Sequence, residues 1–235
     1  MNTFKTYDAA YHEILRQCYN SKSGEILGLS FTLLSPLDRT VDSKTRNFRT
    51  EFAEAFYSWI ISGSSEVSDD LIRLNPRAKD YVTEVDGRNI AYGPRITAQL
   101  GHIVEELRHS PDSRRGTLLI LSAEDQSLLS KKRSDEHSNK AIEYPCTIGQ
   151  QFIIRDNKLH THVFMRSNNM VLTVCYDVYN FTKLQEHVAN LLGVEVGKYI
   201  HTISSAHILP NERELAKKIL EERYGSLNLV CHYSS

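Results

Sequence analysis

Long hydrophobic runs are missing from this chain of 235 residues. No apolar stretch approaches the roughly 20 residues that a membrane-spanning helix needs. Residues 1–5 also have no apolar core of the kind found in a signal peptide. The sequence therefore predicts a cytoplasmic protein with no membrane partner.

Cysteine is scarce, and the four cysteines form no Cys-X-X-Cys pair. This spacing disfavours a structural zinc site and a disulfide framework, so we expect no bound metal. A cysteine in a cytoplasmic protein is ordinarily a small buried apolar residue. A reactive cysteine must therefore be argued from its neighbours.

An excess of charge of either sign is absent as well, since 28 basic residues face 29 acidic ones. That balance gives no general attraction to nucleic acid, which we do not expect as a partner. There is no internal repeat and no Pro- or Gly-rich linker, and the length suffices for one substantial core. We expect residues 1–235 to form a single domain.

Helical and strand patterns alternate along the chain, which is typical of an α/β fold with a mixed sheet. The apolar spacing predicts helices over 7–18, 50–63, 96–107, 181–192 and 210–224. Apolar runs predict strands over 25–34, 118–121, 152–154, 159–165, 171–175 and 199–208. Residues 64–89 read as short helices and loops, residues 124–141 as an exposed loop, and residues 227–235 as a strand or a loosely held tail.

Cys146 stands just before a predicted strand, in a half-polar neighbourhood. Arg166 lies on the partner strand of the same hairpin, where its positive charge would favour a thiolate. These residues indicate a nucleophile, although a core thiol remains an alternative.

Two arginine motifs suggest phosphate binding, because guanidinium forks match phosphate oxygens. One is the adjacent pair Arg114 and Arg115, and the other is Arg166 with the hydroxyl of Ser167. A solvated basic turn is the alternative for the first motif. A carboxylate on an apolar helix face, such as Glu54, is costly unless it is paired or functional.

Taken together, these segments resemble the thymidylate synthase superfamily, and more closely its pyrimidine-nucleotide hydroxymethylase branch. The resemblance spans roughly residues 20–210. It rests on the motifs NFRTEFAE at 47–54, SPDSRR at 110–115, PC at 145–146, RSNN at 166–169 and HTISSAHI at 201–208.

The resemblance implies a large twisted mixed sheet flanked by helices, with two sheets packed face to face in a homodimer. Arg114 and Arg115 would then reach the substrate phosphate in the neighbouring active site. Arg166 and Ser167 would bind the same phosphate from their own chain.

The resemblance also implies the chemistry. Cys146 would attack C6 of a pyrimidine nucleotide, after which C5 takes a one-carbon unit from the co-substrate 5,10-methylenetetrahydrofolate. Glu54 would assist proton transfers, and Tyr92 would support removal of the C5 proton. His207 would contact the sugar, although it reads equally well as a core histidine.

Further roles carried over by the resemblance are Gln151 for the substrate, and Trp59 and Asn169 for the folate. Asn169 departs from the aspartate that the family uses there, and Leu209 replaces a tyrosine that helps to hold the sugar. We find no confident match to an N-terminal phosphate arginine, for which Lys22 and Arg16 are the candidates.

Asp177 stands where uracil-using members of the family carry asparagine. Cytosine offers an acceptor at N3 and an amino donor at N4. A carboxyl group can accept from the N4 amino group and share a proton with N3. Against uracil, a carboxylate oxygen would face O4. Asp177 therefore favours cytidylate, and a helix cap is its structural alternative.

Thr147 and Met165 resemble the phage hydroxymethylases rather than the synthases. The prediction is a cytidylate 5-hydroxymethylase, with CMP and dCMP both open. The alternatives are a thymidylate synthase that methylates dUMP and a non-catalytic nucleotide-binding relative.

Overall fold

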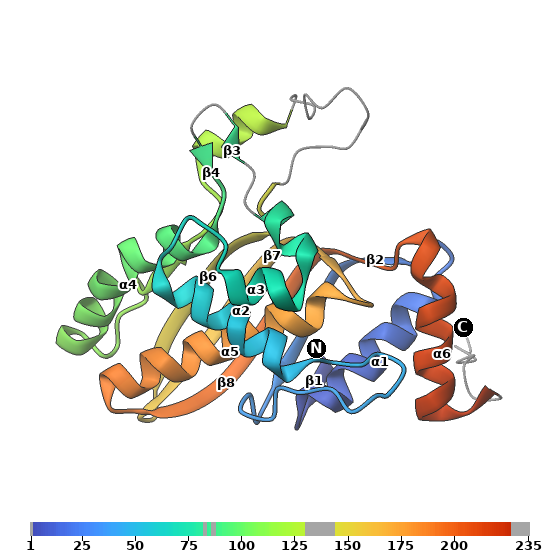
Figure 1. Ribbon diagram of the computed structural model, residues 1–235. Coiled ribbons are helices and arrows are strands. Elements are labelled where there is room, and N and C mark those ends of the chain that lie inside the picture. The colour runs from blue at the N-terminus through green and yellow to red at the C-terminus, as the bar shows by residue number, and fades with distance from the viewer. Residues whose placement is uncertain (1, 82–83, 86–87, 130–143, 227–235) are drawn as a thin grey trace.

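The computed structural model describes residues 2–81, 84–85, 88–129 and 144–226 (Figure 1). Its centre is a six-stranded sheet in the order β1-β2-β8-β7-β6-β5, in which β1–β2 and β7–β8 pair parallel and the other neighbours antiparallel. The predicted mixed sheet is confirmed. The strands are β1 (Asn2–Phe4), β2 (Glu25–Leu33), β5 (Thr117–Leu119), β6 (Thr147–Arg155), β7 (Lys158–Asn169) and β8 (Glu195–His207).

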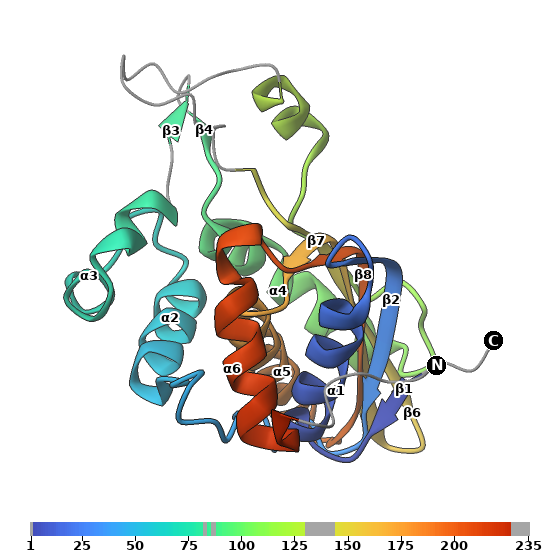
Figure 2. The same ribbon diagram turned by 90° about the vertical axis from the view of Figure 1, so that its right-hand side faces the viewer.

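Helices α1, α5 and α6 lie together on one side of the sheet (Figure 2). The α-helices are α1 (Tyr7–Asn20), α2 (Thr50–Ser62), α3 (Asp69–Leu74), α4 (Tyr92–His109), α5 (Thr173–Leu192) and α6 (Arg213–Tyr224). The short elements are the 3₁₀ turns η1 (Pro76–Tyr81), η2 (Ala123–Leu128) and η3 (Pro210–Glu212), and a small ladder of β3 (Glu84–Val85) and β4 (Arg88–Asn89). No helix of the described residues is long and apolar enough to cross a membrane.

Local chemistry explains several of these boundaries. The side chain of Thr6 caps α1 by accepting from the backbone N–H of Ala9 at 3.4 Å. Gly63 ends α2 with a left-handed φ of 71°, a conformation that a residue without Cβ adopts at little cost. Asp156 and Asn157 turn the β6–β7 hairpin with φ values of 52° and 57°, as the favoured two-residue hairpin turn requires.

The core fills the space between the sheet and the helices that cover it. Central strands and helix α5 supply most of it, and large aromatic side chains of α1, β2, β6 and β8 are completely buried there. The largest of these are Tyr7, Tyr11, Phe31, Phe152 and Tyr199.

The structure differs from the sequence-based expectations mainly at residues 171–175. This segment was predicted as a strand, and α5 instead begins at Thr173. A short apolar run reads alike for a buried strand and a buried helix. The side-chain oxygen of Asn169 accepts from the backbone N–H groups of Val171 and Leu172 at 2.9 and 2.8 Å. These two hydrogen bonds turn the chain from β7 into α5.

Smaller differences concern the edges of elements. Strand β1 was not predicted, and the segment 123–128 is a 3₁₀ turn where we expected an exposed loop. Strands β6, β7 and β8 extend beyond their predicted bounds. The remainder of the predicted loop, residues 130–143, and the predicted tail at 227–235 lie outside the described residues.

Candidate active site

A pocket opens beside the chain that leads into β6, and α2, the start of α4 and the first turns of α5 line it as well. Its volume is about 190 Å³. Mostly apolar and aromatic side chains line it, three of them phenols, together with a thiol and a carboxyl group. The lining residues are Phe56, Trp59, Ile90, Tyr92, Tyr144, Pro145, Cys146, Thr173, Tyr176 and Asp177.

Cys146 is half-buried at the entry to β6, and Arg166 holds the segment that precedes it. The Arg166 side chain donates to the carbonyl oxygens of Tyr144 and Pro145, each at 2.9 Å. Its Nη2 lies 3.6 Å from the sulfur of Cys146. A guanidinium at this distance stabilises a thiolate and so promotes its attack on an electrophilic carbon.

Tyr92 fixes the backbone of the cysteine from the opposite direction. Its hydroxyl oxygen accepts from the N–H groups of Cys146 at 3.1 Å and Thr147 at 3.2 Å. Burial, with smaller contributions from Cys146 and Asp177, raises the pKa of Tyr92 well above its ordinary value. The phenol therefore keeps its proton at neutral pH.

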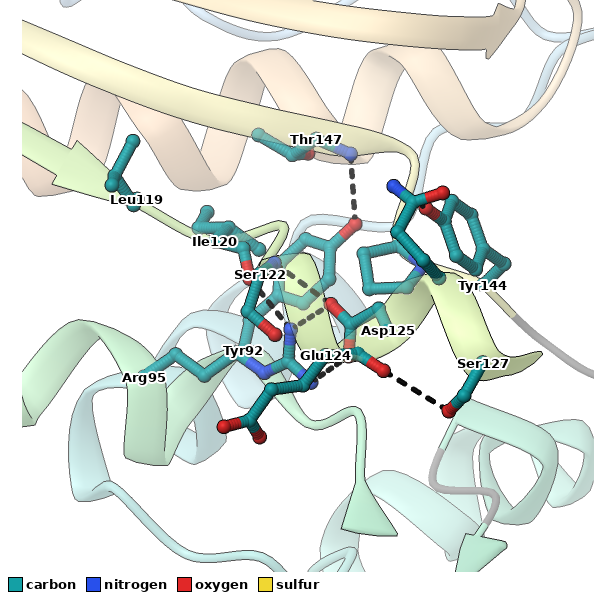
Figure 3. Close-up of polar contacts among 12 residues, drawn as sticks. Tyr92, Arg95, Leu119, Ile120, Ser122, Glu124, Asp125, Ser127, Tyr144 and Thr147 are labelled. Atoms are coloured by element: carbon teal, nitrogen blue, oxygen red, sulfur yellow. Dashed lines mark hydrogen bonds and ion pairs between the residues drawn. The ribbon is translucent and has the colours of Figure 1, made fainter. Parts of the chain in front are cut away.

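A buried ion pair braces the helix that carries Tyr92 (Figure 3). Arg95 donates to both carboxylate oxygens of Asp125, at 2.6 and 2.8 Å, and to the carbonyl oxygen of Ile120 at 2.6 Å. Burial would raise the pKa of Asp125, but the hydrogen bonds from Arg95 and the Ser122 backbone lower it below its usual value. The pair ties the first turn of α4 to the chain beyond β5.

Asp177 lies in the first turns of α5, with its carboxyl group at the pocket. Asn168 donates to its Oδ2 at 2.7 Å. Burial raises the pKa of Asp177 to about 7, although hydrogen bonds from Asn168 and Thr173 act in the opposite direction. A carboxyl group in this state exchanges a proton readily near neutral pH.

Aromatic rings form much of the pocket wall. Phe56 and Trp59 stack with ring centroids 5.8 Å apart and an angle of 15° between their planes. Tyr176 stacks on Phe48 at 5.1 Å, and the guanidinium of Arg46 lies 5.2 Å from its ring centroid. The wall offers flat apolar surface suited to a heteroaromatic ring.

Glu54 lies on another face of α2, away from the pocket lining. Its carboxylate accepts from the Tyr179 hydroxyl and lies 3.1 Å from the ammonium of Lys183. Burial raises its pKa, but these partners together lower it below its usual value. In an α-helix, residues two apart point in nearly opposite directions. The pocket therefore receives Phe56, and the predicted catalytic carboxylate at position 54 faces α5.

Arg114, Arg115 and Gln151 do not line the pocket of their own chain either. Arg115 is exposed and pairs with Glu106 at 2.7 Å. Gln151 donates to the backbone carbonyl of Arg114 at 2.9 Å and so supports the turn that presents both arginines.

Ser167 and His207 lie together at the ends of β7 and β8, with Oγ 3.4 Å from Nδ1. Asn169 is the register partner of His207, but its side chain binds other groups, since its amide donates to Glu212 and its oxygen accepts from the backbone N–H groups of Val171 and Leu172 just before α5. Of the N-terminal candidates, Arg16 pairs with Glu13 at 2.7 Å and Lys22 is exposed.

A family model described as thymidylate synthase matches residues 47–230. The chain belongs to the thymidylate synthase family. The match covers every residue that lines the pocket, so the resemblance drawn from the sequence motifs is confirmed.

Two phage relatives refine the comparison within the thymidylate synthase family. A deoxyuridylate hydroxymethyltransferase of Delftia phage PhiW-14 is 28% identical over 199 residues, which are 82% of this chain and 55% of the relative. A deoxyuridylate hydroxymethyltransferase of Bacillus phage SP01 is 27% identical over 201 residues, which are 78% of this chain and 50% of the relative. The chain thus spans about half the length of these relatives.

The fold agrees with a solved thymidylate synthase. The thermostable thymidylate synthase A from Bacillus subtilis superposes with a TM-score of 0.72, covering 92% of this chain and 84% of that chain at 20% identity. The thymidylate synthase-like fold is therefore confirmed.

Sequence reasoning missed Phe56, Tyr144 and Tyr176 of this thymidylate synthase-like pocket. It also missed Asn168, which does not line the pocket but donates to Asp177. The aromatic spacing of Phe56 and Trp59 along α2 was a usable signal, because positions three apart share a helix face. Asn168 carried no such signal, since its partner Asp177 is on another element. Among the described residues, no group of three or more His, Cys, Asp or Glu side chains could hold a metal ion.

Proposed function

We propose that this chain is a cytidylate 5-hydroxymethylase, which transfers a one-carbon unit from 5,10-methylenetetrahydrofolate to C5 of CMP or dCMP. One observation carries the proposal: Cys146 and Asp177 line the same pocket, beside the guanidinium that approaches the thiol. A nucleophile and a base-reading carboxyl group at one site suit a pyrimidine ring.

Cys146 is the nucleophile of this proposal. Its sulfur forms a bond to C6, the C5–C6 double bond breaks, and its electron pair moves to C5. The positive charge of Arg166, 3.6 Å from the sulfur, would favour the thiolate for this attack. With Ser167, Arg166 would also bind the nucleotide phosphate. His207, next to Ser167, contacts the sugar.

Asp177 reads the base. In its protonated form it offers one donor and one acceptor, which match N3 and the N4 amino group of cytosine. The pKa of about 7 makes this form available at neutral pH. Uracil presents the reverse order of donor and acceptor, and a mismatched buried polar pair costs about 1–3 kcal/mol.

The folate would supply the one-carbon unit, and the aromatic wall fits it. Phe56 and Trp59 offer stacked rings at the pocket. Asn169 does not support the folate role inferred from the resemblance, because its amide is engaged by Glu212 and the start of α5.

Proton transfer falls to the titratable groups that line the pocket. Tyr92 would support removal of the C5 proton as a hydrogen-bond donor to the water that takes this proton, because its oxygen accepts two backbone N–H groups and its own proton stays in place. Glu54 would require a change in the packing of α2 to take part, because Tyr179 and Lys183 hold its carboxylate.

The uncovered face of the sheet supports a homodimer. Leu119, Gly149, Phe164 and Thr202 are neighbours in register across β5, β6, β7 and β8, so their side-chain positions share one face. Leu119 and Phe164 remain 56% and 36% exposed there. A second copy packed on this face would bury them and bring Arg114 and Arg115 towards the partner's pocket.

The test is incubation with methylenetetrahydrofolate and C5-tritiated CMP, dCMP or dUMP. We expect tritium release from a cytidylate without the absorbance rise that dihydrofolate formation produces. Release from dUMP alone would contradict the cytidylate assignment, and an absorbance rise would indicate a synthase. No release from any of the three nucleotides would favour the non-catalytic alternative.

Deoxyuridylate is the second candidate substrate, because both phage relatives are named for it. The variant Asp177→Asn separates the two. If cytidylate is the substrate, the variant shifts preference towards dUMP, and an unchanged preference means that Asp177 does not read the base.

A further inference from the structure

A chain of buried hydrogen bonds runs from the core to the base-reading carboxyl group. The Tyr199 hydroxyl lies 2.6 Å from Nδ1 of His201, and Nε2 of His201 lies 3.2 Å from Oδ1 of Asn168. Asn168 then donates through Nδ2 to Oδ2 of Asp177 at 2.7 Å. Tyr199 and His201 are completely buried and Asn168 is 2% exposed, so water does not compete for these groups.

The direction of every bond in this chain follows from chemistry. Both hydrogens of the Asn168 amide have acceptors, Oδ2 of Asp177 and Oγ1 of Thr173 at 3.2 Å. Its oxygen must therefore accept, which places a hydrogen on Nε2 of His201.

His201 is neutral, because burial, with a smaller contribution from His162, lowers its pKa to about 3. A neutral imidazole carries one N–H, so Nδ1 is an acceptor and the Tyr199 hydroxyl donates to it. Phe31 stacks on the imidazole with centroids 5.2 Å apart and holds the ring in place.

We propose that Tyr199, His201 and Asn168 are positioning residues that set the order of donor and acceptor on the Asp177 carboxyl group. Because Oδ2 accepts from Asn168, the acidic proton resides on Oδ1, and the group presents a donor at Oδ1 and an acceptor at Oδ2. In the reversed arrangement Asp177 would direct its proton from Oδ2 to Asn168, so it would present only acceptors to the base and would no longer match cytosine. The inference rests on the proposed function only in that Asp177 reads a pyrimidine.

Histidine nitrogen NMR on the free protein tests the direction without any ligand. We expect His201 to carry its proton on Nε2, with Nδ1 unprotonated, from about pH 5 to about pH 8. A proton on Nδ1 would overturn the proposal whatever the substrate is.

Nucleotide binding tests the consequence. The variant Tyr199→Phe keeps the ring and removes the first donor. His201 and Asn168 lie between Tyr199 and Asp177, the residue proposed to contact the base. We expect the ratio of the dissociation constants for dCMP and dUMP to move towards one by about tenfold, because the acidic proton of Asp177 is no longer confined to Oδ1. His201→Phe retains the stacking on Phe31 and should have the same effect.

Tyr7→Phe is the matched control, because Tyr7 is equally buried but lies in a separate cluster beside Cys175. Tyr7→Phe should leave the ratio of the dissociation constants for dCMP and dUMP unchanged. Thermal unfolding of all variants measures their loss of stability. A purely structural role predicts that Tyr199→Phe loses stability like Tyr7→Phe and keeps the wild-type ratio, which would overturn the proposal.

The two proposals fail in different ways. In one outcome the wild type prefers dUMP while Tyr199→Phe and His201→Phe both move the ratio of dissociation constants towards one. That result would refute the cytidylate assignment and support the positioning role of Tyr199, His201 and Asn168. A preference for dCMP that neither variant changes would support the cytidylate assignment and refute the positioning role.

Discussion

At the scale of single residues, the pocket depends on side chains that modify one another. Arg166 approaches the sulfur of Cys146, and Tyr92 holds the backbone of the same residue. Asp177 faces that pair across the pocket with a raised pKa. Substitutions here should therefore change chemistry and recognition more than stability.

Cys146→Ala should abolish tritium release from C5, because the variant cannot form the bond to C6. Its dissociation constant for the nucleotide should stay within about threefold of the wild type, since the phosphate and base contacts remain. Isothermal titration and the release assay check both. The control Cys18→Ala removes a thiol buried in α1 and should lower stability while activity per folded molecule persists.

Binding of dCMP should weaken as the pH rises through about 7, where Asp177 loses its proton. Below that pH the acid donates to N3, and above it a carboxylate oxygen faces the N3 lone pair. The loss should approach about tenfold per pH unit. The dissociation constant for dCMP should be measured in the Cys146→Ala variant, which has no thiol to titrate. Tyr92 stays protonated over this range, because burial raises its pKa.

Asp177→Asn provides the comparison for this pH dependence. It should bind dCMP more weakly at low pH and lose the dependence altogether. A wild-type dissociation constant that stays flat between about pH 6 and about pH 8 would contradict proton sharing by Asp177.

At the scale of elements, the pocket depends on how α2, α4 and η2 are held against the sheet. Gly93 lets α4 approach α2 closely, since a Cβ there would lie 2.8 Å from the carbonyl oxygen of Ile60. The Arg95–Asp125 pair ties the same turn of α4 to η2. Both features place Tyr92 against the cysteine backbone.

Gly93→Ala should lower the free energy of unfolding by about 1–3 kcal/mol through overpacking against α2. It should also reduce activity, because Tyr92 must shift. Gly101→Ala is the control on the same helix, where nothing lies within 4 Å of the added Cβ, and it should add up to about 1 kcal/mol. Urea unfolding compares them, and equal effects would contradict the close approach.

Asp125→Ala should destabilise the protein by about 3 kcal/mol, because it leaves the guanidinium of Arg95 partly buried without its partner. Thermal and urea unfolding measure the loss. Arg73→Ala breaks ion pairs that are largely exposed and should cost less than about 1 kcal/mol. A similar cost for both would show that burial does not strengthen the inner pair.

At the scale of the whole molecule, helices cover one face of the sheet (Figure 2). The opposite face carries the exposed side chains of Leu119 and Phe164. Arg114 and Arg115 are exposed and lie away from their own pocket. A homodimer would account for both facts, because each chain would lend its arginines to the other.

Phe164→Asp should shift a dimer towards monomers by placing a charge in that interface, as sedimentation would show. Subunit complementation tests the shared site. Cys146→Ala and the double variant Arg114→Ala with Arg115→Ala should each be inactive alone. Their mixture should recover about a quarter of the activity, since half of the molecules are mixed dimers with one complete site. No recovery, or a fully active monomer, would contradict arginines acting across the interface.

The sequence alone determined the family and the order of the motifs, and it singled out Cys146, Arg166 and Asp177 as candidates for the chemistry. Motifs lie within short stretches of chain, and apolar periodicity specifies most elements because it reflects which face is buried. It also predicted the helices over 7–18, 50–63 and 96–107, which the structure confirms.

Only the tertiary structure decided which side chains meet at the pocket. The docking of α2 turned Phe56 inward and left Glu54 to Tyr179 and Lys183, and an apolar run at 171–175 became part of a helix. Asn168 and His201 came to hold Asp177 because strands β7 and β8 pack under α5. Residue types are written in the chain, but their contacts depend on how its elements pack against one another.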